Sequence, residues 1–380
     1  MTAPGPVRRY LDNAATSWPK PEPVLAAWND ASRRVGATAG RATYREAVEA
    51  DTIRHAARTA AARLLGGVAP DRVALPAGCT LALNMTIHGL VRPGDHVIAT
   101  AADHNATLRP LRWLERHAGL ALTIVPCDSL GRVDPAAIAA AWRPDTRLVV
   151  MSHASNVTGA VQDVAAIADI AHERGGLLVL DAAQSLGLVR CDRPAYGADV
   201  VAAPAHKWLH GTSGAAILWA RAGVEIAPFV QGGTGSASDS LDMPEAFTER
   251  LEAGTPDVPA LAALAAAAAW LEERGVAAGC RSMAAAFADG LRAARGVRVF
   301  AAEAGAPIVS FTVEGYAPAE VAVLVEQIAG AQVRAGHHCA AAIHDCLRTR
   351  DGGTVRASFG AFNTIDDAEA LVAAVATMAD

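Results

Sequence analysis

Two short apolar runs, each followed by charged residues, most constrain what this chain can fold into. The first run, residues 177–180, comes after two glycines and is closed by Asp181. The second, residues 200–203, is followed by His206 and Lys207. Short apolar runs of this kind are typical of strands buried on both faces of a parallel sheet, and one crossover connection fits between them. An acid and a lysine are therefore expected to meet at the carboxyl edge of one sheet, where open α/β sheets bind ligands.

An acid and a lysine in that position suit pyridoxal 5'-phosphate (PLP). A lysine can hold the aldehyde of this cofactor as an imine, while an acid faces the pyridine nitrogen and keeps it protonated. Taken one at a time, Asp181 is better explained as a helix cap and Lys207 as a surface lysine. The wider sequence around both residues is therefore needed to distinguish a PLP site from these two ordinary explanations.

The composition permits a large packed interior and excludes several classes of function. The chain has 380 residues, of which 52% are hydrophobic and 19% charged, and a net charge of −6. This length suggests roughly two to three domains, and the charge provides no basic surface for nucleic acid. The alanine-rich run 261–270 is too short to span a membrane. Because the N-terminus lacks the apolar core of a signal peptide, we expect a cytoplasmic protein whose six cysteines are free thiols.

Apolar runs and helical stretches alternate along the first part of the chain. Besides the two runs above, strands are expected at 73–75, 96–100, 120–125 and 148–152, with helices over 42–65 and up to Leu90. This alternation predicts a mostly parallel sheet covered by helices. No Gly-x-Gly-x-x-Gly follows a strand and no Walker lysine is present, so dinucleotide and nucleoside triphosphate binding lack their motifs. After an alanine-rich helix, the expected elements are strands at 297–300, 308–313, near 333 and at 355–358, and helices from Pro318 and Asp366.

The two runs and the residues after them resemble the class V aminotransferase family of fold-type I PLP enzymes. The family signature is a strand-end Asp-x-x-Gln followed by a Ser/Thr-Gly-His-Lys turn; this chain has Asp-Ala-Ala-Gln at 181–184 and Pro-Ala-His-Lys at 204–207. The resemblance implies an α/β fold: a large domain with a mostly parallel seven-stranded sheet covered by helices, and a smaller α/β C-terminal domain. It also implies that Lys207 binds PLP covalently and acts in catalysis. Pro204 departs from the pattern, because the family has a phosphate-binding hydroxyl there.

The resemblance also implies contacts to PLP from side chains that follow other strands. Thr80, in a small-residue turn that opens a helix, is implied to bind the phosphate, and His104 to stack on the cofactor ring and act in catalysis. Asn156 is implied to bind the 3′-oxygen. The ordinary explanations are an N-cap threonine, a capping histidine and a turn asparagine. The other implied cofactor contacts are Asp181, Gln184, His206 and Lys207.

Two loop segments resemble elements that complete the site in this family. Leu-Asp-Asn-Ala-Ala-Thr at 11–16 resembles the start of cysteine desulfurases, whose N-terminal arm returns to the active-site entrance, which implies that Asn13 contacts the substrate. Prolines are expected to exclude regular structure over 18–23. The glycine-rich segment 232–236 and Thr255 resemble a loop pair that reaches the neighbouring subunit's cofactor phosphate, which implies a homodimer. A plain flexible loop is the alternative.

The C-terminal part carries a second informative cluster, Arg-Ala-Gly-His-His-Cys at 334–339. It resembles Suf-type cysteine desulfurases and selenocysteine lyases, which implies that Cys339 is the sulfur-accepting nucleophile and that Arg356 grips the substrate α-carboxylate. We expect His337 or His338 to hold a positive charge that lowers the pKa of Cys339. A buried cysteine that packs as a small apolar residue is the alternative. The histidines and cysteines of this region fit no standard zinc spacing, so no metal is expected.

The sequence thus predicts a PLP-dependent cysteine desulfurase. It would remove sulfur from L-cysteine to give L-alanine, through a Cys339 persulfide, for a sulfur-acceptor protein that the sequence does not identify. L-selenocysteine stays open as a substrate, as in a selenocysteine lyase. The alternatives are another class V reaction, such as β-elimination or transamination, and a PLP-fold sulfur-relay scaffold with little turnover. The expected domains are an N-terminal arm at 1–25, a large PLP-binding domain at 26–255 and a small C-terminal domain at 256–380.

Overall fold

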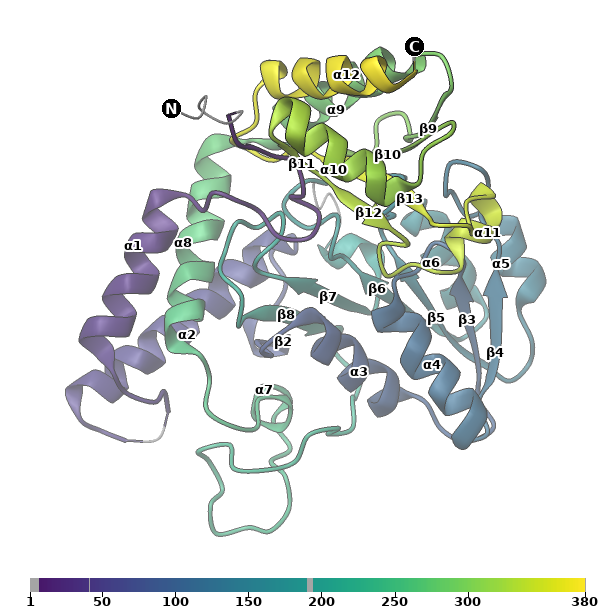
Figure 1. Cartoon of the computed structure of the whole chain (residues 1–380). Coiled ribbons are helices and arrows are strands. Elements are labelled where there is room, and N and C mark those ends of the chain that lie inside the picture. Colours follow the sequence, from purple (N-terminus) through teal and green to yellow (C-terminus); the bar gives the residue numbers. More distant parts are fainter. Residues whose placement is uncertain (1–6, 41, 190–193, 380) are drawn as a thin grey trace.

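A seven-stranded sheet forms the centre of the computed structural model, which describes residues 7–40, 42–189 and 194–379 (Figure 1). The strand order is β2-β8-β7-β6-β5-β3-β4. Strands β3 to β7 pair in parallel, whereas β8 and β2 are added antiparallel at one edge. The predicted mostly parallel sheet is therefore confirmed. Its strands are β2 Val73–Ala74, β3 His96–Thr100, β4 Ala121–Val125, β5 Thr146–Ser152, β6 Leu177–Asp181, β7 Val200–Pro204 and β8 Ala216–Ala220.

Helices cover both faces of this sheet, which explains why its strands are apolar throughout. Successive side chains point to opposite faces: in β5, Val149 and Met151 join one core, while Leu148 and Val150 join the other. The helix predicted from residue 42 begins at Arg45. The first core includes α2 Arg45–Leu64, α5 Pro135–Ala141, α6 Val164–Glu173 and α8 Val258–Arg274; the second includes α3 Cys79–Leu90, α4 Asn105–His117 and α7 Phe247–Leu251.

A second sheet, four-stranded and antiparallel, carries the C-terminal part of the chain in the order β12-β13-β10-β9. Phe287, Phe311 and Phe359 contact one another in its core. Val333, where the sequence predicts one strand, separates two short strands instead. The elements are β9 Val297–Phe300, β10 Ile308–Val313, β11 Ala331–Gln332, β12 Arg334–Gly336, β13 Thr354–Ser358, α9 Ala277–Arg292, α10 Pro318–Ala329 and α12 Ile365–Ala379.

The N-terminal segment links the two sheets. β1 Arg9–Tyr10 pairs in parallel with β11, and the next residue, Leu11, is buried in the second core. Helix α1 Glu22–Asp30 then lies against α8 (Figure 1). The expectation that prolines exclude regular structure up to residue 23 is wrong at its end, because Pro23 stands in the first turn of α1, where its missing N–H is not needed. Short helical turns lie at Ala31–Val35, Pro70–Arg72 and Pro194–Gly197.

The segment after β12 returns to the first sheet. Helix α11 Ile343–Leu347 belongs to the C-terminal part of the sequence, yet Ala340, Ile343 and Leu347 are buried in the core of the seven-stranded sheet. Helix α8 packs into the same core. We therefore propose that the limit between the two domains lies after α8 rather than at residue 255.

The described residues contain free cysteines and no membrane-crossing helix. Cys79, Cys127, Cys280, Cys339 and Cys346 are free thiols, as expected. The sixth cysteine, Cys191, lies outside the described residues. Within these residues, no helix combines the length and apolarity needed to cross a bilayer.

Candidate active site

A pocket at the carboxyl ends of β5, β6 and β7 collects most of the predicted cofactor contacts. The first turns of α3 and α4 also border it. Its empty space is about 380 Å³, part of which is open to solvent. Its lining residues are Cys79, Thr80, Leu83, His104, Ala106, Ser152, Ala154, Asn156, Asp181, Ala183, Gln184 and Lys207.

Asp181 and Lys207 meet in this pocket, as expected from their positions after adjacent strands. β6 and β7 are parallel neighbours, with Asp181 opposite Ala202. The Oδ1 of Asp181 accepts a hydrogen bond from the N–H of Ala183 at 2.9 Å, and the Cys79 thiol lies 3.9 Å from the same oxygen. Burial raises the pKa of Asp181 and lowers the pKa of Lys207, while the opposite charges counteract both shifts. Burial thus favours the neutral amine of Lys207, which is the form that attacks an aldehyde.

His104 borders the pocket and also caps α4. Its Nδ1 accepts a hydrogen bond from the N–H of Ala106 at 3.0 Å. Burial, helped by the positive charge of Lys207, lowers the pKa of His104 to about 4. The ring is therefore neutral near pH 7, and its proton is on Nε2 because Nδ1 is an acceptor. His104 therefore caps α4 and also lines the pocket, while its stacking on the cofactor ring and its part in catalysis stay predictions.

The start of α3 forms a site that suits an anion. Gly78 is the N-cap, and its carbonyl accepts a hydrogen bond from Ala82. The N–H groups of the first helical turn have no partner within the helix, and the helix dipole adds positive charge there. Thr80 belongs to this turn and lines the pocket. Pro204 is buried at the end of β7 and is not part of the lining.

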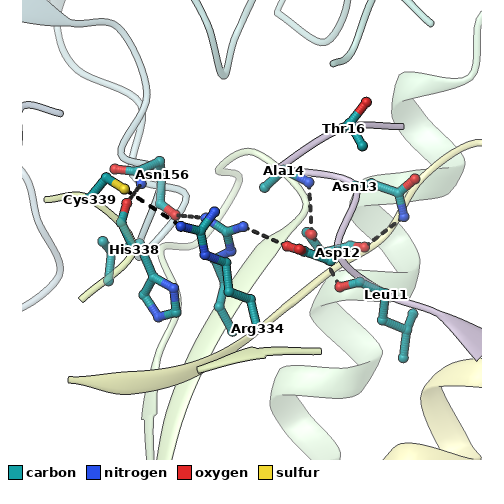
Figure 2. Close-up of polar contacts among 12 residues, drawn as sticks. Leu11, Asp12, Asn13, Ala14, Thr16, Asn156, Arg334, His338 and Cys339 are labelled. Atoms are coloured by element: carbon teal, nitrogen blue, oxygen red, sulfur yellow. Dashed lines mark hydrogen bonds and ion pairs between the residues drawn. The ribbon is translucent and has the colours of Figure 1, made fainter. Parts of the chain in front are cut away.

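Asn156 and Gln184 line the pocket and also brace its walls. The Nδ2 of Asn156 donates to the carbonyl of His338 at 2.6 Å, as Figure 2 shows. The Nε2 of Gln184 donates to the carbonyl of Ala14 at 3.0 Å, and its Oε1 accepts a hydrogen bond from Nε1 of Trp208 at 2.6 Å. These contacts tie the pocket to the N-terminal arm and to the loop after β12.

His206 joins the N-terminal arm to the turn that carries Lys207. Its carbonyl accepts hydrogen bonds from the N–H of Ser17 at 3.0 Å and from Nζ of Lys20 at 2.8 Å. Its Nδ1 is buried and has no hydrogen-bond partner among the described residues. His206 does not line the pocket, so its predicted contact with the cofactor stays a prediction.

Buried neutral histidines should make the protein sensitive to acid. The pKa of each of four histidines is lowered by burial to about 4, whereas an unfolded histidine titrates near 6.5. The unfolded chain therefore binds more protons in this range, so the free energy of unfolding falls as pH drops from about 6.5 toward 4. Asp103 and Asp181 oppose this trend, because burial raises the pKa of both carboxyls, that of Asp103 to about 7, but four histidines outweigh two carboxyls. The histidines are His104, His153, His206 and His210.

Urea unfolding at pH 5 and pH 7 measures this effect. We expect a clearly lower midpoint at pH 5. A midpoint that is equal or higher at pH 5 would contradict the neutral state of these histidines.

Arg356 is almost completely buried and is already paired. Its Nη2 donates to Oδ1 of Asp12 at 2.6 Å, and its Nη1 donates to the carbonyl of Asn156 at 3.0 Å. Its Nε is buried without a partner among the described residues. Burial lowers the pKa of Arg356, and the charge of Asp12 counteracts that shift. A carboxylate entering this site therefore meets a guanidinium that Asp12 partly occupies, a partner that the sequence did not single out.

Replacing Asp12 with asparagine should destabilise the protein. The change leaves a buried guanidinium without its counter-charge, which costs about 3 kcal/mol of unfolding free energy. An added carboxylate ligand such as L-alanine should restore more stability to the variant than to the parent, because the two carboxylates no longer compete for Arg356. Thermal unfolding with and without L-alanine measures both effects.

The matched control is Asp289→Asn. Asp289 pairs with Arg292 at the surface, with 73% of its side chain exposed, so we expect a loss below about 1 kcal/mol. Equal losses in the two variants would show that Asp12 does not compensate the buried charge.

Cys339 lies in a groove that opens from the pocket. Thr80 and His104 line both spaces, and the Cys339 side chain is exposed. The backbone is left-handed at His338 (φ 51°) and Cys339 (φ 57°), which non-glycine residues adopt where the surroundings impose it. The N–H of Asn105, at the start of α4, donates to the carbonyl of Cys339 at 2.7 Å and holds the loop there.

The positive charge beside Cys339 comes from Arg334. Its Nη2 lies 3.6 Å from the Cys339 Sγ (Figure 2). The expectation that His337 or His338 supplies this charge is wrong for His338, and for His337 it stays a prediction. The Nε2 of His338 lies 2.9 Å from Oγ1 of Thr354, and burial holds its pKa well below the usual range. Among the described residues, no three or more His, Cys, Asp or Glu side chains gather into a group that could hold a metal ion.

Asn13 and Thr255 do not line the pocket. The Nδ2 of Asn13 donates to the carbonyl of Ser358 at 2.9 Å and to Oδ1 of Asn363 at 3.0 Å. This buried amide anchors the arm, which differs from the predicted substrate contact. Thr255 lines a separate cavity together with Thr234. Its contact with a neighbouring subunit's cofactor stays a prediction.

Known proteins similar to this chain match almost all of its length. The family model described as Aminotransferase class-V matches residues 9–371. A probable cysteine desulfurase from Methanothermobacter thermautotrophicus is 33% identical over 378 residues, covering 95% of this chain and 92% of that protein. One from Pseudomonas aeruginosa is 36% identical over 373 residues, covering 95% and 91%. The solved apo structure of a cysteine desulfurase from Thermococcus onnurineus superposes with a TM-score of 0.90 at 28% identity, covering 97% of this chain and 94% of that one.

Proposed function

We propose, from the premise that this chain belongs to the class V aminotransferase family, that it is a PLP-dependent cysteine desulfurase. The observation that carries the proposal is the position of Cys339. Its thiol lies beside the guanidinium of Arg334, in a groove that shares Thr80, His104 and Ala106 with the pocket of Lys207. The relatives described above as probable cysteine desulfurases support the same activity.

The pocket residues fit PLP. The start of α3 with Thr80 suits the phosphate, Asp181 suits the ring nitrogen, and Lys207 suits the aldehyde. The neutral ring of His104, which lines the pocket, can lie on the cofactor ring. PLP supplies a sink for the electrons that are released when the substrate Cα loses its proton.

The remaining roles belong to three residues that line the pocket and to Arg356, which is buried and does not line it. Arg356 binds the substrate α-carboxylate in competition with Asp12. The amine of Lys207, whose pKa is lowered by burial, takes the proton from Cα and later returns a proton to the product. Asn156 and Gln184 use their remaining hydrogen-bonding capacity for the cofactor.

Cys339 performs the sulfur transfer. Its thiolate attacks the sulfur of the substrate L-cysteine, and a sulfur–sulfur bond forms as the carbon–sulfur bond of the substrate breaks. The electron pair of the broken bond remains with the substrate carbon, which takes up a proton, and the product is L-alanine. Cys339 is left as a persulfide for a thiol acceptor. Arg334 stabilises the negative charge on sulfur at the start of this step.

Two alternatives make different products from the same pocket. Another class V reaction, such as β-elimination, needs no protein thiol and gives no persulfide. A selenocysteine lyase prefers L-selenocysteine. The deciding experiment supplies L-cysteine to the holoenzyme and measures alanine, sulfide and protein persulfide together, then repeats the assay with L-selenocysteine. Alanine without persulfide would favour the first alternative, and a protein that binds no PLP would favour a sulfur-relay scaffold.

Two loops suggest that the active form is a homodimer. Thr255 and the glycine-rich segment 232–236 do not line the pocket of their own chain, which leaves them for a neighbouring site. Sedimentation of the active protein tests this proposal. A fully active monomer would contradict it.

Replacing Pro204 with serine should tighten PLP binding. Proline offers neither hydroxyl nor N–H, so a phosphate contact is missing at the end of β7. A hydrogen bond to a charged group contributes about 1.5–3 kcal/mol, which corresponds to roughly 10- to 100-fold in affinity. PLP release during dialysis measures the change. Pro204→Ala is the matched control, because it removes the ring without adding a hydroxyl; equal retention in the two variants would rule out the missing contact.

A further inference from the structure

We propose that Lys20 of the N-terminal arm is a positioning residue for Lys207. This inference rests on the proposed function, in which Lys207 attaches PLP and moves a proton at the substrate Cα. Lys20 does not line the pocket, so it acts only through the backbone that carries Lys207. The connection between the two lysines is the carbonyl of His206, the residue directly before Lys207.

Donors from the arm surround the carbonyl of His206. It accepts hydrogen bonds from Nζ of Lys20 at 2.8 Å, from the N–H and Oγ of Ser17 at 3.0 and 3.1 Å, and from Oγ1 of Thr16 at 3.0 Å. A carbonyl oxygen has two lone pairs, so these four groups occupy it fully. Nζ of Lys20 also donates to Oγ of Ser17 at 2.8 Å, which ties the donors to one another.

Lys20 makes the strongest of these contacts. Burial lowers the pKa of Lys20 to about 8, so its amine is still mostly protonated near pH 7. A hydrogen bond from a charged donor is shorter and stronger than one from a neutral donor, and 2.8 Å is the shortest of the four distances. Removal of this amine should therefore disturb the carbonyl more than removal of either hydroxyl.

The position of this carbonyl fixes where the Lys207 side chain begins. A peptide unit is planar, so the oxygen of His206 lies in one plane with the N and Cα of Lys207. On the other side of that Cα, the N–H of His210 donates to the carbonyl of Lys207 at 3.0 Å. Both peptide units that meet at Lys207 are thus held, one by the arm and one by the following loop. Together they set the direction in which the side chain enters the pocket.

Other contacts hold the arm without the amine of Lys20. β1 pairs with β11, and Oδ1 of Asp12 accepts a hydrogen bond from Arg356 at 2.6 Å. The arm should therefore stay docked when the amine is removed, and Arg356 should keep its partner. We expect the effect on Lys207 and not on the binding of the substrate carboxylate.

The test compares Lys20→Met with Lys20→Arg in the full-length holoenzyme. Methionine keeps an apolar side chain without a donor, whereas arginine keeps a charged donor. We expect Lys20→Met to retain the borohydride-reducible link at Lys207. After dialysis, however, it should attach added PLP more slowly, and its kcat for alanine should fall by about tenfold at an almost unchanged KM for L-cysteine. Lys20→Arg should recover most of both rates.

The matched control is Arg8→Met, which loosens the arm at its start. The guanidinium of Arg8 lies 3.7 Å from the centre of the Trp18 ring, and its Nε donates to Gln332 at 2.9 Å. The substitution leaves every donor to the carbonyl of His206 in place. We therefore expect Arg8→Met to attach PLP and to produce alanine at the parent rates.

Four results would overturn the inference. The first is a Lys20→Met variant with the parent attachment rate and kcat. The second is an equal loss in Lys20→Met and Lys20→Arg, which would show that the shape of the side chain matters and not its donor. The third is a rise in KM at unchanged kcat, which would place the effect on substrate binding. The fourth is an equal loss in Arg8→Met. A parent protein that forms no borohydride-reducible link would instead overturn the proposed function, so the two failures are distinct.

Discussion

Replacing Lys207 with alanine is expected to abolish the covalent attachment of PLP and nearly all turnover. Lys207 lies in the pocket with Asp181, and burial favours the neutral amine that attachment requires. Loss of a residue that moves a proton at the reacting carbon typically costs about 10²–10⁴-fold in rate. Alanine production from L-cysteine measures the rate. Borohydride reduction followed by peptide mapping measures the attachment.

The chain itself offers a matched control for this variant. It contains only two lysines, Lys20 and Lys207. Lys20 is also partly buried, and burial lowers its pKa to about 8, but its Nζ donates to Ser17 and to the carbonyl of His206 and holds the N-terminal arm. Lys20→Met should therefore keep the borohydride-reducible link to PLP. A link that survives in Lys207→Ala and disappears in Lys20→Met would assign the cofactor lysine to the arm.

The central sheet could be predicted from the sequence because its strands are buried on both faces. Runs such as 148–151 are continuously apolar, since each successive side chain enters a different core. β6 and β7 are parallel neighbours, so their carboxyl ends lie at the same edge of the sheet. The sequence alone therefore sufficed to predict that Asp181 and Lys207 lie at that edge. The short edge strand β2 and the antiparallel strand β8 belong to the same sheet, but their position depends on pairing partners distant in sequence.

Contacts between distant segments could not be predicted in the same way. Asp12 and Arg334 both stand within motifs that identified the family, yet their partners depend on how the arm, the loop after β12 and β13 fold together. Arg356 pairs with Asp12 across the two ends of the chain. Arg334 reaches Cys339 only because the loop turns through two left-handed residues. A motif records which residues are present, whereas the direction of each side chain follows from packing that the motif does not describe.

The charge of a histidine could not be predicted from its place in the sequence either. A histidine next to a cysteine in sequence is a reasonable source of positive charge. In the folded chain, however, His338 is buried and bonded to Thr354, so it is neutral. Burial keeps His338 uncharged although it is next to Cys339 in the sequence. The positive charge beside the Cys339 sulfur comes from Arg334, which is permanently charged.

Replacing Cys339 with alanine should leave PLP binding intact and stop sulfur transfer. The thiol lies in the groove outside the pocket of Lys207, so its removal takes away no residue that lines the cofactor site. Without a nucleophile for the substrate sulfur, we expect no protein persulfide and alanine production lower by on the order of 10³-fold. The assay measures bound PLP, alanine and persulfide on L-cysteine, with a reductant present throughout.

The comparison with Cys346→Ser separates the possible outcomes of that experiment. Cys346 is the next cysteine along the same segment, but it does not line the groove or the pocket, so its variant should produce alanine like the parent. If alanine production survives in Cys339→Ala and falls in Cys346→Ser, the nucleophile is misassigned. If it survives in both, the protein is not a thiol-dependent desulfurase. L-selenocysteine must be tested second, because selenide leaves more easily than sulfide and can be released without the thiol; alanine from that substrate alone would still agree with Cys339 as the sulfur acceptor.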